Sequence, residues 1–315
     1  MENDKTLLTA PAPKPKHTAK KRKETLFLIC MLALPVLQWL VFWLYVNFSS
    51  IMLAFQDQRT GEFTFTNFAM FWDSLISPYG EIRIALKNTL IYFCTSLFVI
   101  MPIALVISYF LYKRVIFYKG FRVIFYLPAI ISGVAMVAVF TNFIDPTGPL
   151  GTIVKLFGGE IPPEGLLGRP TTATWTIVAY CIWTGFCGNI LLFSGAMARV
   201  PIDVLESAKL EGISPTRELL SIVFPLIWPT VSTQIIFVFT GLFTSSGPIL
   251  LFTNGNNDTT TISFWIFSQV YGNGAVGGSG SYNLVSATGL CFTVVGVPII
   301  LFVRWLMEKI PAVEY

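Results

Sequence analysis

The sequence is poor in charged residues and nearly devoid of histidine. Of its 315 residues, 12% are Asp, Glu, Lys or Arg, while 54% are hydrophobic. A soluble globular domain carries about 25% charged residues, so this chain lacks the side chains that would cover a water-facing surface. The composition therefore predicts a membrane protein. The one histidine, His17, stands in a polar segment, which argues against histidine-based catalysis and metal binding.

The sequence also lacks motifs that would indicate disulfides, metal sites or nucleotide hydrolysis. Its cysteines are odd in number, form no CxxC pair and all lie in apolar runs, at Cys30, Cys94, Cys181, Cys187 and Cys291. We interpret them as small buried hydrophobic residues. No GxxxxGK[ST] occurs, so the chain has no P-loop. We expect no catalytic residue and no metal site in this chain.

What the sequence does contain is a series of long apolar runs. A membrane-spanning helix needs about 20 apolar residues, and inside the membrane such runs must be helical. The predicted spans are residues 26–46, 88–112, 122–144, 173–198, 221–246 and 285–307. Residues 1–25 form a basic, proline-containing arm that we expect to be disordered. The predicted fold is therefore an all-α integral membrane domain, residues 26–315, with about six spans.

The distribution of Lys and Arg predicts the orientation of these spans. Most of the 21 Lys and Arg residues lie in the arm, in segments 113–122 and 199–217, and at the C-terminal end, whereas loop 247–284 has none. Positive charge is retained on the cytoplasmic side. Both termini are therefore predicted to be cytoplasmic, and this distribution explains the net charge of +4 without a nucleic-acid partner.

The spans carry no Asp, Glu, Lys, Arg or His beyond their edges. Proton-coupled carriers place such groups within the membrane, so their absence argues against a proton-driven carrier. A channel, or a carrier with a Na⁺ site built from carbonyl groups, stays open as an alternative. A membrane-embedded enzyme is disfavoured because the acidic residues are scattered over loops. If transport is active, the energy enters through another polypeptide.

Residues 199–220 form the most informative loop. They predict two short helices separated by Gly212, which suits a left-handed residue at a helix end. Asp203 is the predicted N-cap of the first helix, with Glu206 completing a capping box. Ser214 is the predicted cap of the second helix, which has Pro215 at its first position.

The same loop resembles the EAA loop of ABC importer permeases. Glu206-x-Ala208, then Gly212, then Ile222-x-x-Pro225 follow the spacing of that motif. In the family, this loop forms a coupling helix that docks into a separate ATPase. The resemblance implies that Glu206 faces the ATPase, that Ala208 packs closely and that Gly212 allows the bend. The sequence departs from the motif at two positions, where Ser207 replaces an alanine and Phe224 a leucine.

Three weaker matches point to one branch of this family. Asn88-Thr89-Leu90 at the second span, residues 121–128 at the third, and Asn254-Gly255 after the fifth resemble sugar permeases of the maltose, glycerol-phosphate and oligosaccharide type. The resemblance implies a type I importer fold, a second similar permease, an ATPase dimer and an extracytoplasmic solute-binding protein. It also implies that ATP and Mg²⁺ bind the ATPase and that this chain needs no cofactor. An importer of a non-sugar solute remains an alternative, because all import classes share the EAA loop.

The resemblance also indicates where a sugar could pass. The maltose permease positions and their polar or aromatic neighbours correspond here to Tyr180, Trp183, Thr184, Gly185, Gly188, Asn189, Gln234, Gly241 and Ser245. Amides and hydroxyls can hydrogen-bond sugar hydroxyls, and aromatic rings can stack on apolar sugar faces. The competing interpretation is helix packing, which is the usual role of small residues in spans. Several glycines would leave a roomy pocket, which favours an oligosaccharide.

Overall fold

The computed structural model describes residues 17–271 and 282–310. Residues 1–16 of the predicted arm and the glycine-rich part of loop 247–284 lie outside the described residues. The described residues are helical, apart from loops and one isolated β-bridge between Gln56 and Phe63. The chain divides into two units, residues 1–53 and 54–315. The predicted all-α fold is confirmed.

The first unit is one long helical stretch. It runs through α1 (His17–Gln38), the π-helical turn η1 (Trp39–Tyr45) and α2 (Val46–Ala54), whose last residue belongs to the second unit. Trp39 and Trp43 stack on it with ring centroids 5.2 Å apart. The helix begins at His17, so residues 17–25 are helical and were wrongly included in the disordered arm. Residues 22–54 are long and apolar enough to span a membrane.

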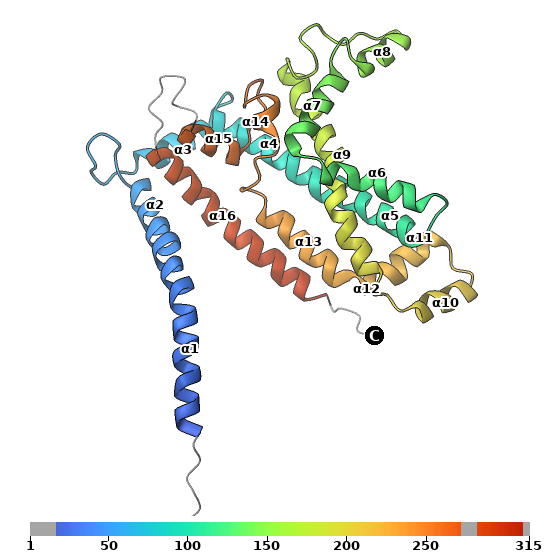
Figure 1. Cartoon of the computed structure of the whole chain (residues 1–315). Helices are drawn as coiled ribbons and strands as arrows, with labels where there is room; N and C mark the ends of the chain where they lie inside the picture. Colours follow the sequence, from blue (N-terminus) through green and yellow to red (C-terminus); the bar gives the residue numbers. More distant parts are fainter. Residues whose placement is uncertain (1–16, 272–281, 311–315) are drawn as a thin grey trace, which may run out of the picture. The chain divides into compact units, whose positions relative to one another are not determined.

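The second unit is a helical bundle with short helices at both ends (Figure 1). One end carries α10–α12, and the opposite end carries α3, α14 and α15; we call these the α10 end and the α15 end. The elements are α3 (Thr66–Ile76), α4 (Glu81–Thr95), η2 (Ser96–Ile100), α5 (Met101–Tyr112), α6 (Tyr118–Ile130), α7 (Gly133–Ile144), α8 (Pro149–Leu156), α9 (Pro170–Met197), α10 (Ile202–Leu210), α11 (Pro215–Glu218), η3 (Leu219–Val223), α12 (Phe224–Leu226), α13 (Trp228–Thr240), α14 (Ile249–Phe252), α15 (Ile262–Tyr271) and α16 (Tyr282–Glu308).

Four helical stretches of the described chain are long and apolar enough to cross a membrane, and the number rises to six if each of two bent pairs is one span. The continuous stretches are residues 22–54, 81–112, 170–197 and 282–308. These stretches contain predicted spans one, two and six, and cover all but the last residue of the fourth. Predicted spans 122–144 and 221–246 fall on the two bent pairs, which are residues 118–130 with 133–156 and residues 215–226 with 228–240.

Local sequence explains both breaks. Between α6 and α7 the chain bends by 108°, and Ser132 takes an extended conformation there and caps α7 by accepting a hydrogen bond from the N–H of Ala135. Between α12 and α13 the bend is 78° at the buried Ile227. Pro225 and Pro229 flank it, and a proline cannot donate to the helical ladder. Helix α13 ends at Thr240. Residues 241–246, which were predicted to belong to the fifth span, therefore lie beyond this helix.

Three clusters of buried apolar residues hold the second unit together. At the α10 end, α5, α9, η3 and α13 share a core that includes Leu105, Ile190, Phe193 and Val223. At the α15 end, α3, α4, α15 and α16 pack around Phe71, Trp265 and neighbours. A smaller cluster joins α7 to α9 and α14. Two of these three clusters therefore lie at opposite ends of the bundle.

Candidate functional site

The loop that follows α9 folds as two helices around Gly212, as predicted. Helix α10 ends in a Schellman arrangement, in which the Gly212 N–H donates to the Lys209 carbonyl and the Ile213 N–H to the Ala208 carbonyl, each at 3.2 Å. Gly212 has φ +69°, which glycine adopts without strain. Ser214 precedes Pro215 at the start of α11, but its side chain makes no capping hydrogen bond.

The predicted capping box at the start of α10 is wrong. Pro201 is the N-cap residue, with no side-chain hydrogen bond, and the helix begins at Ile202, one residue before the predicted cap. Asp203 instead lies in the first turn, where a negative charge is favoured by the helix dipole. Proline fixes the chain in an extended conformation at 201, so it sets the start of the helix.

Helix α10 presents one face inward and one outward. Ala208 is 4% exposed and Leu205 packs on the core at the α10 end, whereas Glu206, Ile202 and Leu210 are exposed. The glutamate is therefore accessible from solvent and lies between two exposed apolar side chains. Pro225, the last residue of the motif, lies in α12 just before the bend into α13.

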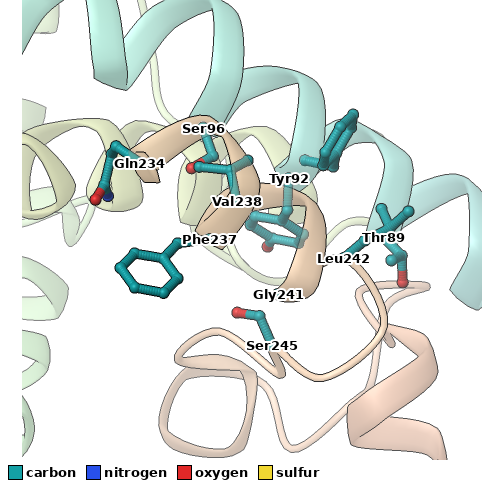
Figure 2. A pocket seen from close by; sticks show the side chains of 10 residues that line it. Thr89, Tyr92, Ser96, Gln234, Phe237, Val238, Gly241, Leu242 and Ser245 are labelled. Carbon is teal, nitrogen blue, oxygen red and sulfur yellow. The ribbon is translucent and has the colours of Figure 1, made fainter. Parts of the chain in front are cut away.

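A cavity of about 260 Å³, lined by both polar and apolar side chains, lies between α4–η2 and α13 (Figure 2). We call it the central pocket. Its lining residues are Thr89, Tyr92, Phe93, Ser96, Gln234, Phe237, Val238, Gly241, Leu242 and Ser245. Tyr92 and Ser96 come from the first wall, and Gln234 and Phe237 from the second. Its volume is close to the lower end of small-molecule sites, which is about 300 Å³.

A second cavity, of about 320 Å³, lies toward the α10 end and shares two lining residues with the first. Gln234 and Phe237 line both cavities. Gln234 Nε2 donates to Asn189 Oδ1 at 2.7 Å, which joins α13 to α9. The two cavities therefore meet at an amide–amide hydrogen bond and an aromatic ring. A larger cavity of about 1,020 Å³ between α3, α4 and α16 is lined mainly by apolar side chains and offers little to a polar solute.

The structure brings together only some of the predicted pathway residues. Gln234, Gly241 and Ser245 line the central pocket, and Asn189 reaches its edge through Gln234. Tyr180 is buried against Phe140 and Phe252 in a separate cluster.

The remaining four predicted residues lie elsewhere on α9. The Thr184 hydroxyl donates to the Tyr180 carbonyl of its own helix at 3.0 Å. A Cβ at Gly185 would come 2.9 Å from Ile100 Cδ1, so this glycine allows close packing of α9 on η2. Gly188 faces open space and Trp183 stacks near Phe140. None of these four lines the central pocket.

The prediction missed the wall formed by α4 and η2. Thr89, Tyr92 and Ser96 are spaced three and four residues apart, so they share one helix face, and this spacing was a readable signal. The π-helical turn η2 directly precedes α5, in which Pro102 cannot donate to the ladder. Such turns are frequent at functional sites.

Asn88 and Thr89 attach this wall to the loop at the α15 end. Asn88 Nδ2 donates to the carbonyls of Asp258 and Thr260, at 2.6 and 2.9 Å. Thr89 Oγ1 accepts from the Ile262 N–H at 3.0 Å. Both side chains are 4% exposed. Their role in the structure is therefore to hold a loop some 170 residues away against the middle of α4. Within residues 17–271 and 282–310, no three His, Cys, Asp or Glu side chains gather as metal ligands.

The family match lies within the second unit. Residues 85–310 match the family described as "Binding-protein-dependent transport system inner membrane component". A probable ABC transporter permease of Mycoplasma genitalium, MG188, is 30% identical over 248 residues, which are 72% of this chain and 70% of that protein. The lactose transport system permease LacF of Rhizobium radiobacter is 25% identical over 243 residues, 75% of this chain and 77% of LacF.

A similar fold occurs in a solved structure. One chain of a bacterial alginate ABC transporter, crystallised in complex with alginate pentasaccharide-bound periplasmic protein, aligns with a TM-score of 0.76. The alignment covers 94% of this chain and 98% of that one, at 23% identity. At this level of identity the match supports the arrangement of the helices.

Proposed function

The chain belongs to the family of binding-protein-dependent transport system inner membrane components, and from this membership we propose that it is the permease subunit of an ABC importer for a sugar or oligosaccharide. Its relatives include a lactose permease, and its fold resembles a chain of an alginate importer. The chain would act by alternating access, with its cavities opening in turn to the two sides of the membrane.

The observation that carries the choice of a sugar is the chemistry of the central pocket. Tyr92, Ser96, Gln234 and Ser245 offer hydroxyl and amide groups, and Phe237 offers a ring. Sugars present hydroxyls that need donors and acceptors, together with apolar C–H faces that stack on aromatic rings. The described lining contains no charged side chain, which suits a neutral solute.

We further propose that the solute passes from the central pocket into the cavity on the α10 side. Gln234 and Phe237 line both cavities, and Gln234 is hydrogen-bonded to Asn189, so these groups would close the passage. Separation of α9 from α13 would break the hydrogen bond between Asn189 and Gln234. Hydroxyl groups of the sugar would then form hydrogen bonds with both side-chain amides. Exchange of one hydrogen bond for another keeps the free-energy change of passage small.

The energy for these movements is proposed to come from partner subunits. A second permease would complete the cavity, an ATPase dimer would bind ATP and Mg²⁺, and an extracytoplasmic solute-binding protein would deliver the sugar. This chain would hold no cofactor and catalyse no reaction. With both termini in the cytoplasm, α10 would dock into the ATPase through Glu206 and the exposed Ile202 and Leu210.

Co-purification tests this proposal directly. A tagged copy of the chain, isolated from its native membrane, is expected to bring an ATPase, a second permease and ATP hydrolysis that a sugar-loaded binding protein stimulates. Glu206→Lys reverses the charge on the exposed face of α10 and is expected to lose the ATPase. Glu62→Lys makes the same change in an exposed loop residue at the α15 end and should leave the complex intact.

Two results would contradict the proposal in different ways. If the chain purifies alone and moves solute down its gradient, it is a channel or carrier. If the complete complex hydrolyses ATP only in response to a binding protein loaded with a non-sugar solute, the chain is an importer subunit but its substrate is not a sugar.

A further inference from the structure

One ion pair in the second unit differs from the others. Lys113 Nζ donates to Glu218 Oε2 at 2.8 Å and lies 2.7 Å from Oε1, so the ammonium group is in contact with both carboxylate oxygens. The side chain of Glu218 is 5% exposed and that of Lys113 is 34% exposed. The pair joins residues 105 positions apart in the sequence. It therefore connects two segments that contact only in the folded chain.

The other two ion pairs within the described residues are local and open to water. Arg169–Glu164 and Arg304–Glu308 join residues five and four positions apart, and all four side chains are about half exposed or more. Exposed pairs of this kind contribute little to structure. A carboxylate that is almost fully buried is costly to desolvate and persists only with a close counter-ion. Glu218 is thus held in one place by one partner.

The location of the pair is where α10 meets the bundle. Glu218 is the last residue of α11, six residues after the bend at Gly212, and the next residue, Leu219, enters the core at the α10 end. Lys113 follows the last residue of α5. Its ammonium group also lies 5.9 Å from the centroid of the Tyr109 ring, within the range of a cation–π contact. The ion pair adds one directional contact to the apolar packing that these segments already share.

Each residue of the pair belongs to a segment of the chain that continues into one wall of the central pocket. Helix α5 continues back through η2 and α4, which carry Ser96 and Tyr92. The chain beyond Glu218 continues through η3 and α12 into α13, which carries Gln234 and Phe237. Ser108 Oγ of α5 donates to the Ile190 carbonyl of α9 at 3.2 Å, which adds the helix that carries Asn189. The salt bridge and this hydrogen bond together therefore link α11, and α10 before it, to the helices that carry the lining residues.

We propose that Lys113 and Glu218 are positioning residues that make α5 and α13 follow α10 as one body, so that ATP hydrolysis in the partner is coupled to solute transfer. This inference rests on the proposed function of α10. Without the pair, α10 and α11 move with α13 alone, and the wall formed by α4 and η2 stays behind. The expected defect is futile ATP hydrolysis rather than loss of the complex.

The test uses the complete complex, purified through the tagged chain and reconstituted in vesicles. Lys113→Gln and Glu218→Gln each remove one partner, and the double variant Lys113→Glu/Glu218→Lys reverses the pair. Lys119→Gln and Glu308→Gln remove equal charges from exposed positions and serve as matched controls. For each complex, three quantities are measured: ATPase retained per tagged chain, ATP hydrolysis stimulated by the loaded binding protein, and solute transported per ATP.

We expect solute transported per ATP to fall at least about fivefold in each single variant, the lower end of typical coupling between sites. ATPase retention should stay unchanged, the reversed pair should restore the ratio to within about twofold of the original chain, and both controls should match it. An unchanged ratio in the single variants overturns the proposal. So does a ratio that falls only in proportion to ATPase retention, since the pair would then be purely structural. Failure of the sugar to be transported by the original complex refutes the proposed function instead.

Discussion

The side chain of Tyr92 lines the central pocket, but its hydroxyl oxygen is buried and has no hydrogen-bond partner within the described residues. Such a group destabilises the folded chain, because its hydration is lost without replacement. If the ring turns toward the cavity when solute binds, a solute hydroxyl supplies the missing partner. Removal of the Tyr92 hydroxyl should therefore weaken solute binding without destabilising the folded chain.

We predict that Tyr92→Phe weakens sugar binding and leaves the fold as stable or more stable. Loss of one hydrogen bond is worth about 0.5–1.5 kcal/mol, which is roughly a 2- to 10-fold change in affinity. Equilibrium binding of labelled sugar to the purified complex and thermal unfolding measure the two effects. Tyr180→Phe is the matched control, because Tyr180 packs against Phe140 and Phe252 outside this pocket. Equal losses of sugar binding in both variants would contradict the pocket assignment.

Asn88 shows what a residue pattern can and cannot reveal. The sequence marks Asn88-Thr89-Leu90 as a motif, but a motif does not name its partners. The partners are the carbonyls of Asp258 and Thr260, which only the folded chain brings near. By contrast, the left-handed conformation of Gly212 was predictable, because a helix end requires it locally. Local backbone chemistry can be predicted from sequence, and contacts between distant segments cannot.

At the level of elements, the end of α10 depends on Gly212 for conformational reasons alone. A Cβ at this position would meet no other atom within 4 Å, so a substitution causes no clash. Its φ of +69° nevertheless penalises any residue with a Cβ by about 1–2 kcal/mol, and asparagine less than alanine. The strain falls on the Schellman hydrogen bonds that orient α10, and global packing should hardly change.

We therefore predict that Gly212→Ala weakens binding of the purified ATPase by about 5- to 30-fold, the equivalent of this strain, and that Gly212→Asn weakens it less. The measurement is a titration of the permease pair with ATPase. Gly255→Ala is the contrasting variant: Gly255 also has a positive φ, but its Cβ would come 2.6 Å from Phe264 at the α15 end. That change should lower thermal stability and spare ATPase binding. The idea fails if both variants lose ATPase equally.

Two of the predicted spans are bent pairs of helices. An apolar run satisfies the membrane whether it is straight or bent, so hydrophobicity predicts spans at 122–144 and 221–246 without locating the bends. The bends come from Ser132, which caps a new helix, and from two prolines around Ile227. Capping and proline signals were present in the sequence. Their effect depends on whether neighbouring helices satisfy the freed backbone groups, which sequence does not show.

For the whole molecule, only part of the predicted pathway set lines one cavity, for a related reason. Alignment to relatives selected α9 and α13, and three residues of α13 and the turn after it line the central pocket. The opposing wall comes from α4 and η2, whose polar spacing indicates a common face without indicating what it faces. On α9, Gly185 packs against Ile100, which is the helix-packing interpretation that competed with the functional one.

The orientation of the whole bundle in the membrane is predicted by its charge distribution and required by the proposed docking of α10. The Lys113–Glu218 pair fixes the segment after α5 and helix α11 at the same end of the bundle, whichever way the bundle is inserted. Segment 113–122 is rich in Lys and Arg, and loop 247–284 has neither. The positive-inside rule then places the α10 end in the cytoplasm. Docking of α10 to an ATPase requires the same orientation, although it rests on a different set of residues.

Single cysteines at the two ends decide this orientation. In a variant with its five cysteines replaced by serine, Asn256→Cys is expected to react with a membrane-impermeant maleimide on intact spheroplasts. Lys119→Cys should react only after permeabilisation. Both positions are exposed in the folded chain, so a difference in labelling reports the side of the membrane rather than burial. Each variant must still assemble with its partners. Labelling of Lys119→Cys from outside would then show that the bundle has the opposite orientation, in which α10 is not accessible to a cytoplasmic ATPase.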